Sequence, residues 1–218
     1  NLKADVIYAF MDTASITALL SKFVRWRTKV IWGIRSSDMR LEHYSQLHKF
    51  LRFMECRLSV FSDLIISNSD AGRREAFKDG FKTRKILIVP NGIDTKTFRR
   101  YESKRRVARQ KLNIPKDAFV VGIVARHDPM KGLETFIEAA QNHLHTFPNT
   151  YFVIAGYGLG HYSDFIKQLA FSRLPSTRLT WVEPITDVVS CFNTMYVFTL
   201  TSRFGEGFPN VIGEAMAC

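Results

Sequence analysis

The segment 206–218 combines the residue types that bind a sugar and a phosphate. It reads EGFPNVIGEAMAC and follows an apolar run that is typical of a strand. Gly207 allows a ligand to approach the backbone closely, and Pro209 suits the first turn of a helix because its missing N–H would have no partner there. Glu206 lies in the loop and Glu214 about one turn into the helix, so their carboxylates can accept hydrogen bonds from different hydroxyl groups. Together with the free N–H groups of a helix start, this spacing favours a sugar nucleotide.

A second cluster, at 122–132, reads GIVARHDPMKG and again joins a strand end to a helix. Arg126 and Lys131 lie five positions apart in this loop. Two fixed cations at the carboxyl end of a parallel strand, beside a helix N-terminus, would neutralise a diphosphate and stabilise it as a leaving group. By themselves the two side chains are weak evidence, because an Arg and a Lys in a loop are most often solvated surface residues.

The elements that must position these residues follow from the hydrophobic pattern. Short runs rich in β-branched residues alternate with longer amphipathic stretches, which is the pattern of β-α-β units. The runs resemble strands that are buried on both faces, so we predict parallel sheets. The expected strands are 5–10, 29–34, 63–67, 85–89, 119–125, 151–156, 178–182 and 196–201.

Two amphipathic stretches between these runs are predicted to be helices. In each of them apolar residues recur three and four positions apart, so one face should pack on a sheet. The inward-facing residues are predicted to be Tyr44, Leu47, Leu51, Met54, Leu58 and Phe61 in the first helix, and Leu133, Phe136, Ile137, Ala140 and Leu144 in the second.

The alternation lapses near the middle of the chain, which indicates a domain boundary. A Pro-Asn-Gly turn at 90–92 is followed by the segment 99–111, in which seven of thirteen residues are Lys or Arg. We predict a first domain at 1–98, a basic linker or helix at 99–117 and a second domain at 118–218. The basic segment is either a solvated helix or a contact with an anionic surface. In the helical interpretation the residues turned inward are Tyr101, Val107 and Leu112.

The charge of the chain is uneven and narrows the choice of partners. The 218 residues include 31 Lys and Arg against 20 Asp and Glu, a net charge of +11. Residues 1–117 carry 25 basic against 12 acidic residues, whereas residues 118–218 carry 6 against 8. Such a balance invites an anionic partner. A nucleic-acid-binding protein is disfavoured, because aromatic or recognition-helix signatures are missing beside the basic residues.

The cysteines point to a reducing compartment. Cys56, Cys191 and Cys218 lie far apart and form no C-x-x-C pair, so neither a disulfide framework nor a zinc site is indicated. No apolar run approaches the length of about 18 to 20 residues that spans a bilayer. We therefore predict a cytoplasmic protein.

The chain resembles glycosyltransferase family 4, a group of retaining transferases with the two-domain GT-B fold. The signature of that family is two glutamates separated by seven residues, which Glu206 and Glu214 match. Further matching segments are IISNS at 65–69, VPNGID at 89–94 and the loop 126–132 with its Arg, Lys and Gly. The resemblance implies an α/β protein of two Rossmann-like domains with parallel sheets. Each domain is expected to be incomplete, the first at its start and the second at its end, so that the chain is a fragment.

The resemblance also implies roles for single residues. Arg126 and Lys131 would bind the donor diphosphate and, with Glu206, form the catalytic group. Glu206 would also bind hydroxyls of the donor sugar, and Glu214 those of the ribose. Further donor-binding positions are Gly207, Phe208, Pro209 and Asn210, whose backbone would approach sugar and phosphate, and Glu183, Pro184 and Ile185 beside the nucleobase. The candidates on the acceptor side are Arg35 and Asn91.

The implied activity is hexosyl transfer from a UDP-sugar or GDP-sugar, with retention of configuration, in polysaccharide or glycoconjugate biosynthesis. The acceptor would be a glycan or a lipid-linked glycan. No metal and no cofactor are expected, because the basic pair and the helix dipole neutralise the charge. The basic first half could be drawn to an anionic membrane, which would make the protein peripheral on the inner face of the cell membrane.

Two other functions are weighed against this one. A nucleotide-sugar-binding fragment would keep the donor contacts without turnover, and donor hydrolysis would separate it from an enzyme. A basic nucleic-acid-binding protein would bind DNA or RNA with a steep salt dependence and ignore nucleoside diphosphates.

Overall fold

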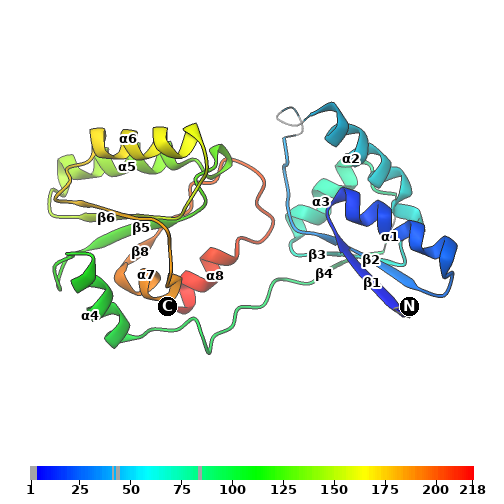
Figure 1. The fold of residues 1–218 in the computed structure, drawn as a ribbon, viewed down its shortest axis with the longest axis horizontal. Helices are drawn as coiled ribbons and strands as arrows, with labels where there is room; N and C mark the ends of the chain where they lie inside the picture. Colours follow the sequence, from blue (N-terminus) through cyan, green and yellow to red (C-terminus); the bar gives the residue numbers. More distant parts are fainter. Residues whose placement is uncertain (1–3, 41, 43–44, 83–84) are drawn as a thin grey trace. The chain divides into compact units, whose positions relative to one another are not determined.

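The computed structural model describes residues 4–40, 42, 45–82 and 85–218, which form two units. By their contacts, Asn1–Gly92 and Phe204–Phe208 make up the first unit, and Ile93–Arg203 and Pro209–Cys218 the second. Each unit is built on a four-stranded sheet in which all strand pairs are parallel (Figure 1). The predicted α/β class with two parallel sheets is therefore confirmed. None of the helices in these residues is long and apolar enough to cross a membrane.

The first unit carries its helices on one face of the sheet (Figure 1). Its strands follow each other in space as in the sequence, in the order β1-β2-β3-β4. Val30 and Trp32 of β2 and Ile65 of β3 are almost fully buried under the helices. The elements are β1 (Val6–Phe10), α1 (Asp12–Val24), β2 (Lys29–Ile34), α2 (Gln46–Leu58), η2 (Ser59–Phe61), β3 (Leu64–Ser67), α3 (Asp70–Asp79) and β4 (Ile86–Ile88).

The strands of the first unit differ from the prediction of burial on both faces. Every second residue of β2 is buried, whereas Val6, Tyr8 and Phe10 of β1 are exposed. Alternation with a period of two is typical of a strand with one covered face. The helices drawn in this unit lie on that one face, which explains the difference (Figure 1).

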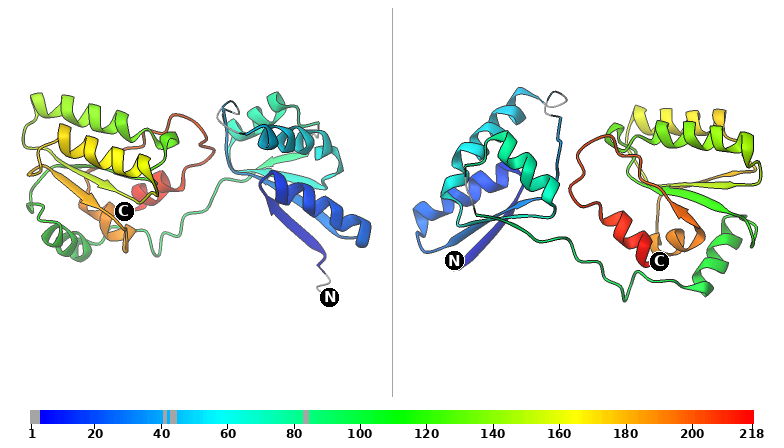
Figure 2. Two further views of the ribbon diagram at one scale, coloured as in Figure 1. Left: turned by 45° about the horizontal axis from the view of Figure 1, so that its top comes forward. Right: turned by 180° about the vertical axis from the view of Figure 1, so that it is seen from behind.

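The second unit has a sheet covered on both faces. Figure 2 shows α5 and α6 on one face and α7 and α8 on the other. One apolar core joins α5 and α6 to β5 and β6, and a separate core joins α7 and α8 to the opposite face of the same strands. The elements are α4 (Glu102–Lys111), β5 (Val120–Val124), η3 (Pro129–Lys131), α5 (Leu133–Thr146), β6 (Tyr151–Ala155), α6 (His161–Arg173), β7 (Leu179–Val182), α7 (Val188–Thr194), β8 (Val197–Phe198) and α8 (Asn210–Ala217).

The strand order of the second sheet reverses at its first strand. The order is β7-β6-β5-β8, so the chain winds outward from β5 through β6 and β7 and then returns to the other side of β5. Such a reversal is the topological switch point at which open α/β sheets bind their ligands, outside the carboxyl ends of the strands. The loops after β5 and β8 meet at this point.

The predicted inward face of the helix α2 is partly wrong. Leu47 and Phe61 are 64% and 63% exposed, while Glu55 and Cys56 are buried. Tyr44 lies outside the described residues. The carboxylate of Glu55 can be buried because the guanidinium of Arg52 lies 2.7 Å away. Phe61 belongs to the 3₁₀ turn η2, whose three-residue period departs from the helical spacing of α2.

Helix α4 is a helix as predicted, but its buried face differs from the prediction. Val107 is 46% exposed, whereas Ala108 and Arg109 are buried. The side chain of Arg109 donates to the carbonyl oxygen of Thr194 at 2.7 and 3.1 Å and to that of Lys116 at 2.6 Å. The basic segment therefore packs against α7. Part of its charge satisfies backbone carbonyls, which neither predicted interpretation of the segment included.

Candidate functional site

The loops after β5 and β8 are joined at the switch point by hydrogen bonds to backbone carbonyl groups. The hydroxyl of Thr201 donates to the carbonyl oxygens of Lys131 at 3.0 Å and of Gly132 at 2.9 Å. The N–H of Arg203 donates to the carbonyl of Met130 at 2.8 Å. These bonds explain why β8 ends at Phe198 rather than at 201, because the following residues turn toward η3 instead of extending the sheet. The backbone of Lys131 is thus held by Thr201, which lies 70 positions further along the chain.

Gly132 is required by this close approach. Its φ of 59° lies in the left-handed region, and a Cβ at this position would overlap the carbonyl oxygen of Thr201. Gly132 also precedes α5, which begins at Leu133. The helix N-terminus therefore lies directly after Lys131, where its dipole favours an anion.

The cations of the loop differ in exposure. The side chain of Arg126 is 60% exposed, and its guanidinium lies 3.9 Å from the carboxylate of Asp128. That carboxylate also accepts a hydrogen bond from the N–H of Met130 at 2.9 Å and so begins the turn η3. Lys131 is half-buried at the end of the turn. The loop can therefore offer Arg126 to an anionic ligand without breaking a close ion pair.

The glycines after β6 serve contacts within the protein. A Cβ on Gly156 would overlap the carbonyl oxygen of Ala125, and a Cβ on Gly158 would lie 2.5 Å from the Cβ of His127. The N–H of His127 donates to the carbonyl of Tyr157 at 2.9 Å. The glycine-bearing loop therefore lies directly against the loop that carries Arg126.

Glu183 is held by side chains of its own unit. Its carboxylate accepts a hydrogen bond from the indole N–H of Trp181 at 3.0 Å and lies 3.8 Å from the amine of Lys167. Pro184 follows through a cis peptide bond and is exposed, and Ile185 is half-buried. These three residues follow β7 at its carboxyl end, the same edge of the sheet as the loops after β5 and β8.

Helix α8 carries the second glutamate of the signature. Asn210 is its first residue, and Pro209 precedes it with a φ of −72°, one position before the predicted first turn. Glu214 lies one turn into the helix and is half-buried. Burial raises the pKa of this carboxyl group. A partly desolvated carboxylate of this kind gains more from a hydroxyl donor than a fully hydrated one does.

The first glutamate belongs by its contacts to the first unit, as part of Phe204–Phe208. The hydroxyl of Ser37 donates to the carbonyl oxygen of Glu206, and the N–H of Gly205 donates to that of Asp38 at 3.1 Å. A Cβ on Gly207 would lie 2.7 Å from the carbonyl oxygen of Arg35, so glycine is required here as well.

Arg35 and Asn91, the predicted acceptor-side residues, are brought together in the first unit. The guanidinium of Arg35 donates to the side-chain oxygen of Asn91. The side-chain amide of Asn91 lies 3.5 Å from the carbonyl oxygen of Phe208. Two residues that are 56 positions apart in the sequence thus form one polar group beside the signature segment.

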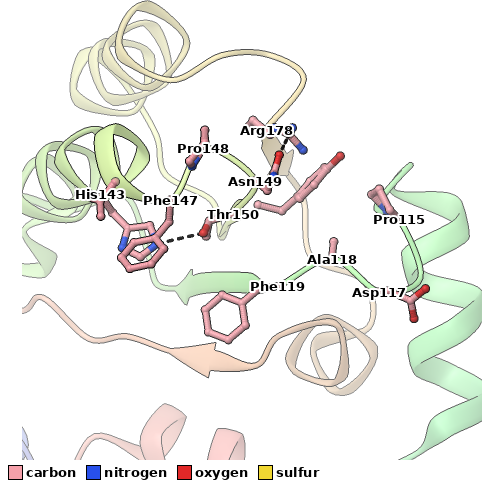
Figure 3. Close-up of a pocket in the computed structure, with 12 residues that line it drawn as sticks. Pro115, Asp117, Ala118, Phe119, His143, Phe147, Pro148, Asn149, Thr150 and Arg178 are labelled. Atoms are coloured by element: carbon pink, nitrogen blue, oxygen red, sulfur yellow. Dashed lines mark hydrogen bonds between the residues drawn. The ribbon is translucent and has the colours of Figure 1, made fainter.

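A separate cavity of about 850 Å³ lies at the opposite end of the second sheet (Figure 3). Its walls come from the residues before β5, β6 and β7, at the amino ends of these strands. Aromatic rings line it, including Phe119 and Phe147, and Arg178 reaches across to Asn149 at 3.0 Å (Figure 3). None of the predicted donor-binding residues lies among those that line this cavity.

Both halves of the chain match families of glycosyltransferases. Residues 104–218 match the family described as "Glycosyl transferases group 1", and residues 1–97 match "Glycosyltransferase Family 4". The first match covers more than half of the chain, and the chain therefore belongs to the group 1 glycosyl transferases. The resemblance drawn from the two glutamates is thereby confirmed.

Several curated or solved proteins are similar to this chain in sequence or in structure. It is 31% identical over 160 residues to the D-inositol 3-phosphate glycosyltransferase of Mycobacterium tuberculosis, which covers 71% of this chain and 32% of that protein. The crystal structure of Anabaena HepE in complex with UDP is 25% identical, with a TM-score of 0.84, over 98% of this chain and 57% of that one. The sucrose-phosphate synthase of Thermosynechococcus elongatus shares the fold, with a TM-score of 0.79 and 18% identity over 98% of this chain and 54% of that one. The chain thus spans about a third of the length of the curated relatives it matches.

Proposed function

We propose that this chain belongs to an enzyme that transfers a hexosyl unit from a nucleoside-diphosphate sugar to an acceptor hydroxyl with retention of configuration. The observation that carries the proposal is the place of Arg126 and Lys131 at the switch point of the second sheet. There the loops after β5 and β8 are bonded to each other and α5 begins. Because the chain belongs to the group 1 glycosyl transferases, the anion expected at this place is the diphosphate of a sugar donor.

The transfer breaks the bond between the anomeric carbon of the donor sugar and an oxygen of the diphosphate. Negative charge develops on that oxygen as the bond breaks, while a bond forms to the acceptor oxygen and the acceptor loses its proton. Arg126 and Lys131 would stabilise this charge, the planar guanidinium and the point-like ammonium matching phosphate oxygens of different geometry. With the helix dipole of α5 they would make a metal ion unnecessary.

The remaining donor contacts are assigned by chemistry. Glu206 would accept hydrogen bonds from hydroxyls of the donor sugar, and Glu214 from those of the ribose. The backbone of 207–210 would approach sugar and phosphate, and the nucleobase would lie beside 183–185. We further propose that the functional division follows the residues 1–98, 99–117 and 118–218.

The donor is proposed to be a UDP-sugar. This choice is supported by the UDP in the crystal structure of HepE, a solved relative that is 25% identical to this chain. The acceptor would be a glycan or a lipid-linked glycan of a polysaccharide or glycoconjugate pathway, with Arg35 and Asn91 on the acceptor side. An anionic membrane surface would then be a further partner, reached from the cytoplasm.

The first experiment is a calorimetric titration of the purified chain with UDP, GDP and ADP at about 0.15 M salt. We expect saturable binding of UDP that is lost in Arg126→Ala and kept in Arg106→Ala, which removes an exposed arginine of α4. Binding that is equal in the two variants would reject the diphosphate site. Incubation with UDP-hexoses and EDTA, followed by NMR of the product anomer, tests turnover, metal independence and retention.

A further inference from the structure

His127 is buried although it stands between two accessible residues of the candidate diphosphate loop. The residue is 6% exposed, whereas the side chain of its neighbour Arg126 is 60% exposed. The loop therefore turns one ring inward while it offers a cation outward. A buried imidazole at this place must find partners in the surrounding elements.

Partners of His127 come from the elements that follow β6 and β7. Its Nδ1 lies 2.8 Å from the hydroxyl oxygen of Ser163 on α6. Its ring centroid is 4.9 Å from that of Trp181 on β7, and its Nδ1 lies 3.8 Å from the carboxylate of Glu183. Its backbone N–H donates to the carbonyl of Tyr157 at 2.9 Å. The loop after β5 is thus fixed at one residue to the loop after β6, to α6 and to β7.

The backbone around His127 is shaped to allow this fixation. Gly158 lies so close that a Cβ would stand 2.5 Å from the Cβ of His127, and Gly156 allows the same approach to Ala125. The glycines at positions 156 and 158 are therefore both needed for His127 to pack in this place. A solvated loop residue would not require glycines in the neighbouring loop.

Electrostatics indicate that His127 acts without a charge of its own. Burial lowers its pKa, and so does the nearby amine of Lys167, while the carboxylate of Glu183 raises it. The ring is therefore neutral near pH 7, and it holds the loop by contact and hydrogen bonding. The cations that would bind phosphate remain Arg126 and Lys131.

We propose that His127 is a positioning residue that fixes the loop 125–132 so that Arg126 and Lys131 can bind one diphosphate together. This inference rests on the proposed function, because it names the residue that holds the proposed diphosphate site in place. His127 would hold the loop from its buried side, while the side chain of Arg126 is exposed to bind the ligand. The nucleoside part of the donor should be affected less. Glu214 would bind its ribose, and Glu183, which lies 3.8 Å from His127 beside the proposed base site, keeps its hydrogen bond from Trp181.

The test compares a nucleoside diphosphate with its nucleoside. Calorimetry with UDP and with uridine is carried out on the wild-type chain, on His127→Leu, on the conservative His127→Asn and on Ser163→Ala. Asn carries an amide nitrogen or oxygen near the place of Nδ1 and can keep the bond to Ser163. The matched control is His143→Leu, which removes a histidine that lies 2.9 Å from the hydroxyl of Thr150 at the other end of the sheet.

In His127→Leu we expect the UDP affinity to fall about tenfold, since a shifted loop misplaces both cations. Uridine affinity should change by less than about twofold in this variant, and His127→Asn should recover most of the loss, because the bond to Ser163 is kept. Ser163→Ala should lower UDP affinity in the same direction, and His143→Leu should leave it unchanged.

Several results would overturn the inference. If wild type binds UDP and both His127→Leu and Ser163→Ala bind it equally well, His127 has no positioning role. Equal losses of UDP and uridine affinity would show a general loss of structure instead. If His127→Leu does not fold, Ser163→Ala and His127→Asn decide the question. If the wild-type chain binds no nucleoside diphosphate, the proposed function itself fails. If the wild-type chain binds UDP and the variants bind it with the same affinity, only the inference about His127 fails.

Discussion

At the scale of single residues, the two glutamates of the signature are expected to act on different parts of the donor. Glu214→Ala should weaken the binding of UDP and of UDP-glucose alike, because the ribose is common to both. Glu206→Ala should leave UDP binding nearly intact and weaken UDP-glucose. Each lost charge-assisted hydrogen bond should cost about 1 to 3 kcal/mol of binding free energy. Calorimetry with both ligands measures the difference.

The control for this pair is Glu138→Ala, which removes an exposed glutamate of α5. It should leave both affinities unchanged. Equal losses of UDP affinity in Glu206→Ala and Glu214→Ala would contradict the division of roles.

His127 also gives a prediction for stability against pH. Burial lowers the pKa of its ring below the ordinary value of 6.5, so the unfolded chain takes up a proton at a higher pH than the folded chain does. The contribution of this residue to the free energy of unfolding is therefore complete above about pH 6.5 and is lost as the pH falls further. Urea unfolding of wild type and His127→Asn at pH 7.5 and pH 5 measures it. The drop in stability between the two pH values should be smaller in the variant, and equal drops would rule out His127 as a source.

At the scale of elements, the packing of α4 against α7 depends on cations. Lys104 lies 3.3 Å from the carboxylate of Asp187, which precedes α7, and Arg105 donates to the carbonyl of Asn193 at 2.7 Å. Arg109 binds the carbonyl of Thr194, the last residue of α7. Cations at the carboxyl end of a helix also interact favourably with its dipole. A basic helix can therefore be an internal structural element of the second unit.

This packing predicts a large effect for one arginine of α4 and a small one for its neighbour. Arg109→Met should lower the free energy of unfolding by about 2 to 4 kcal/mol, because buried carbonyls lose charge-assisted hydrogen bonds. Arg106→Met removes an exposed cation of the same helix and should change stability by less than about 0.5 kcal/mol. Urea unfolding of both variants is the measurement. If the two variants lose similar amounts of unfolding free energy, the hydrogen bonds of Arg109 make no net contribution to stability.

At the scale of the whole molecule, the net charge of +11 gives a prediction for membrane contact. The exposed cations of α4 and its flanks include Arg100, Arg106 and Lys111. Replacing these three by Gln should weaken binding to vesicles of anionic lipid at low salt by about 1 kcal/mol per charge. Arg105 and Arg109 are left in place because they hold α7.

The matched control removes three charges from α3 instead, as Arg73→Gln, Arg74→Gln and Lys78→Gln. These side chains already pair with acidic neighbours within α3. Vesicle sedimentation should separate the two triple variants. Equal binding by both would show that only the total charge matters, and unchanged binding in the α4 variant would reject the membrane contact of that segment.

The sequence by itself determined the repeating β-α-β pattern, the parallel sheets and the two glutamates of the signature. These features depend on local periods of two and 3.6 residues and on the spacing of a few chemical groups, which are written along the chain. The strands at 29–34 and 151–156 were predicted almost to the residue for this reason.

Only the tertiary structure decided which polar residues are buried and what they bind. Arg109 and His127 read as surface or loop residues in the sequence, yet each is buried against a partner that is distant along the chain. Arg109 binds the carbonyl oxygen of Thr194, and His127 contacts the hydroxyl of Ser163, which lie 85 and 36 positions away. Where a buried polar group is stabilised by distant partners of this kind, local patterns of the sequence carry no signal for its burial. The end of β8 was set in the same way, by hydrogen bonds from Thr201 to the loop after β5.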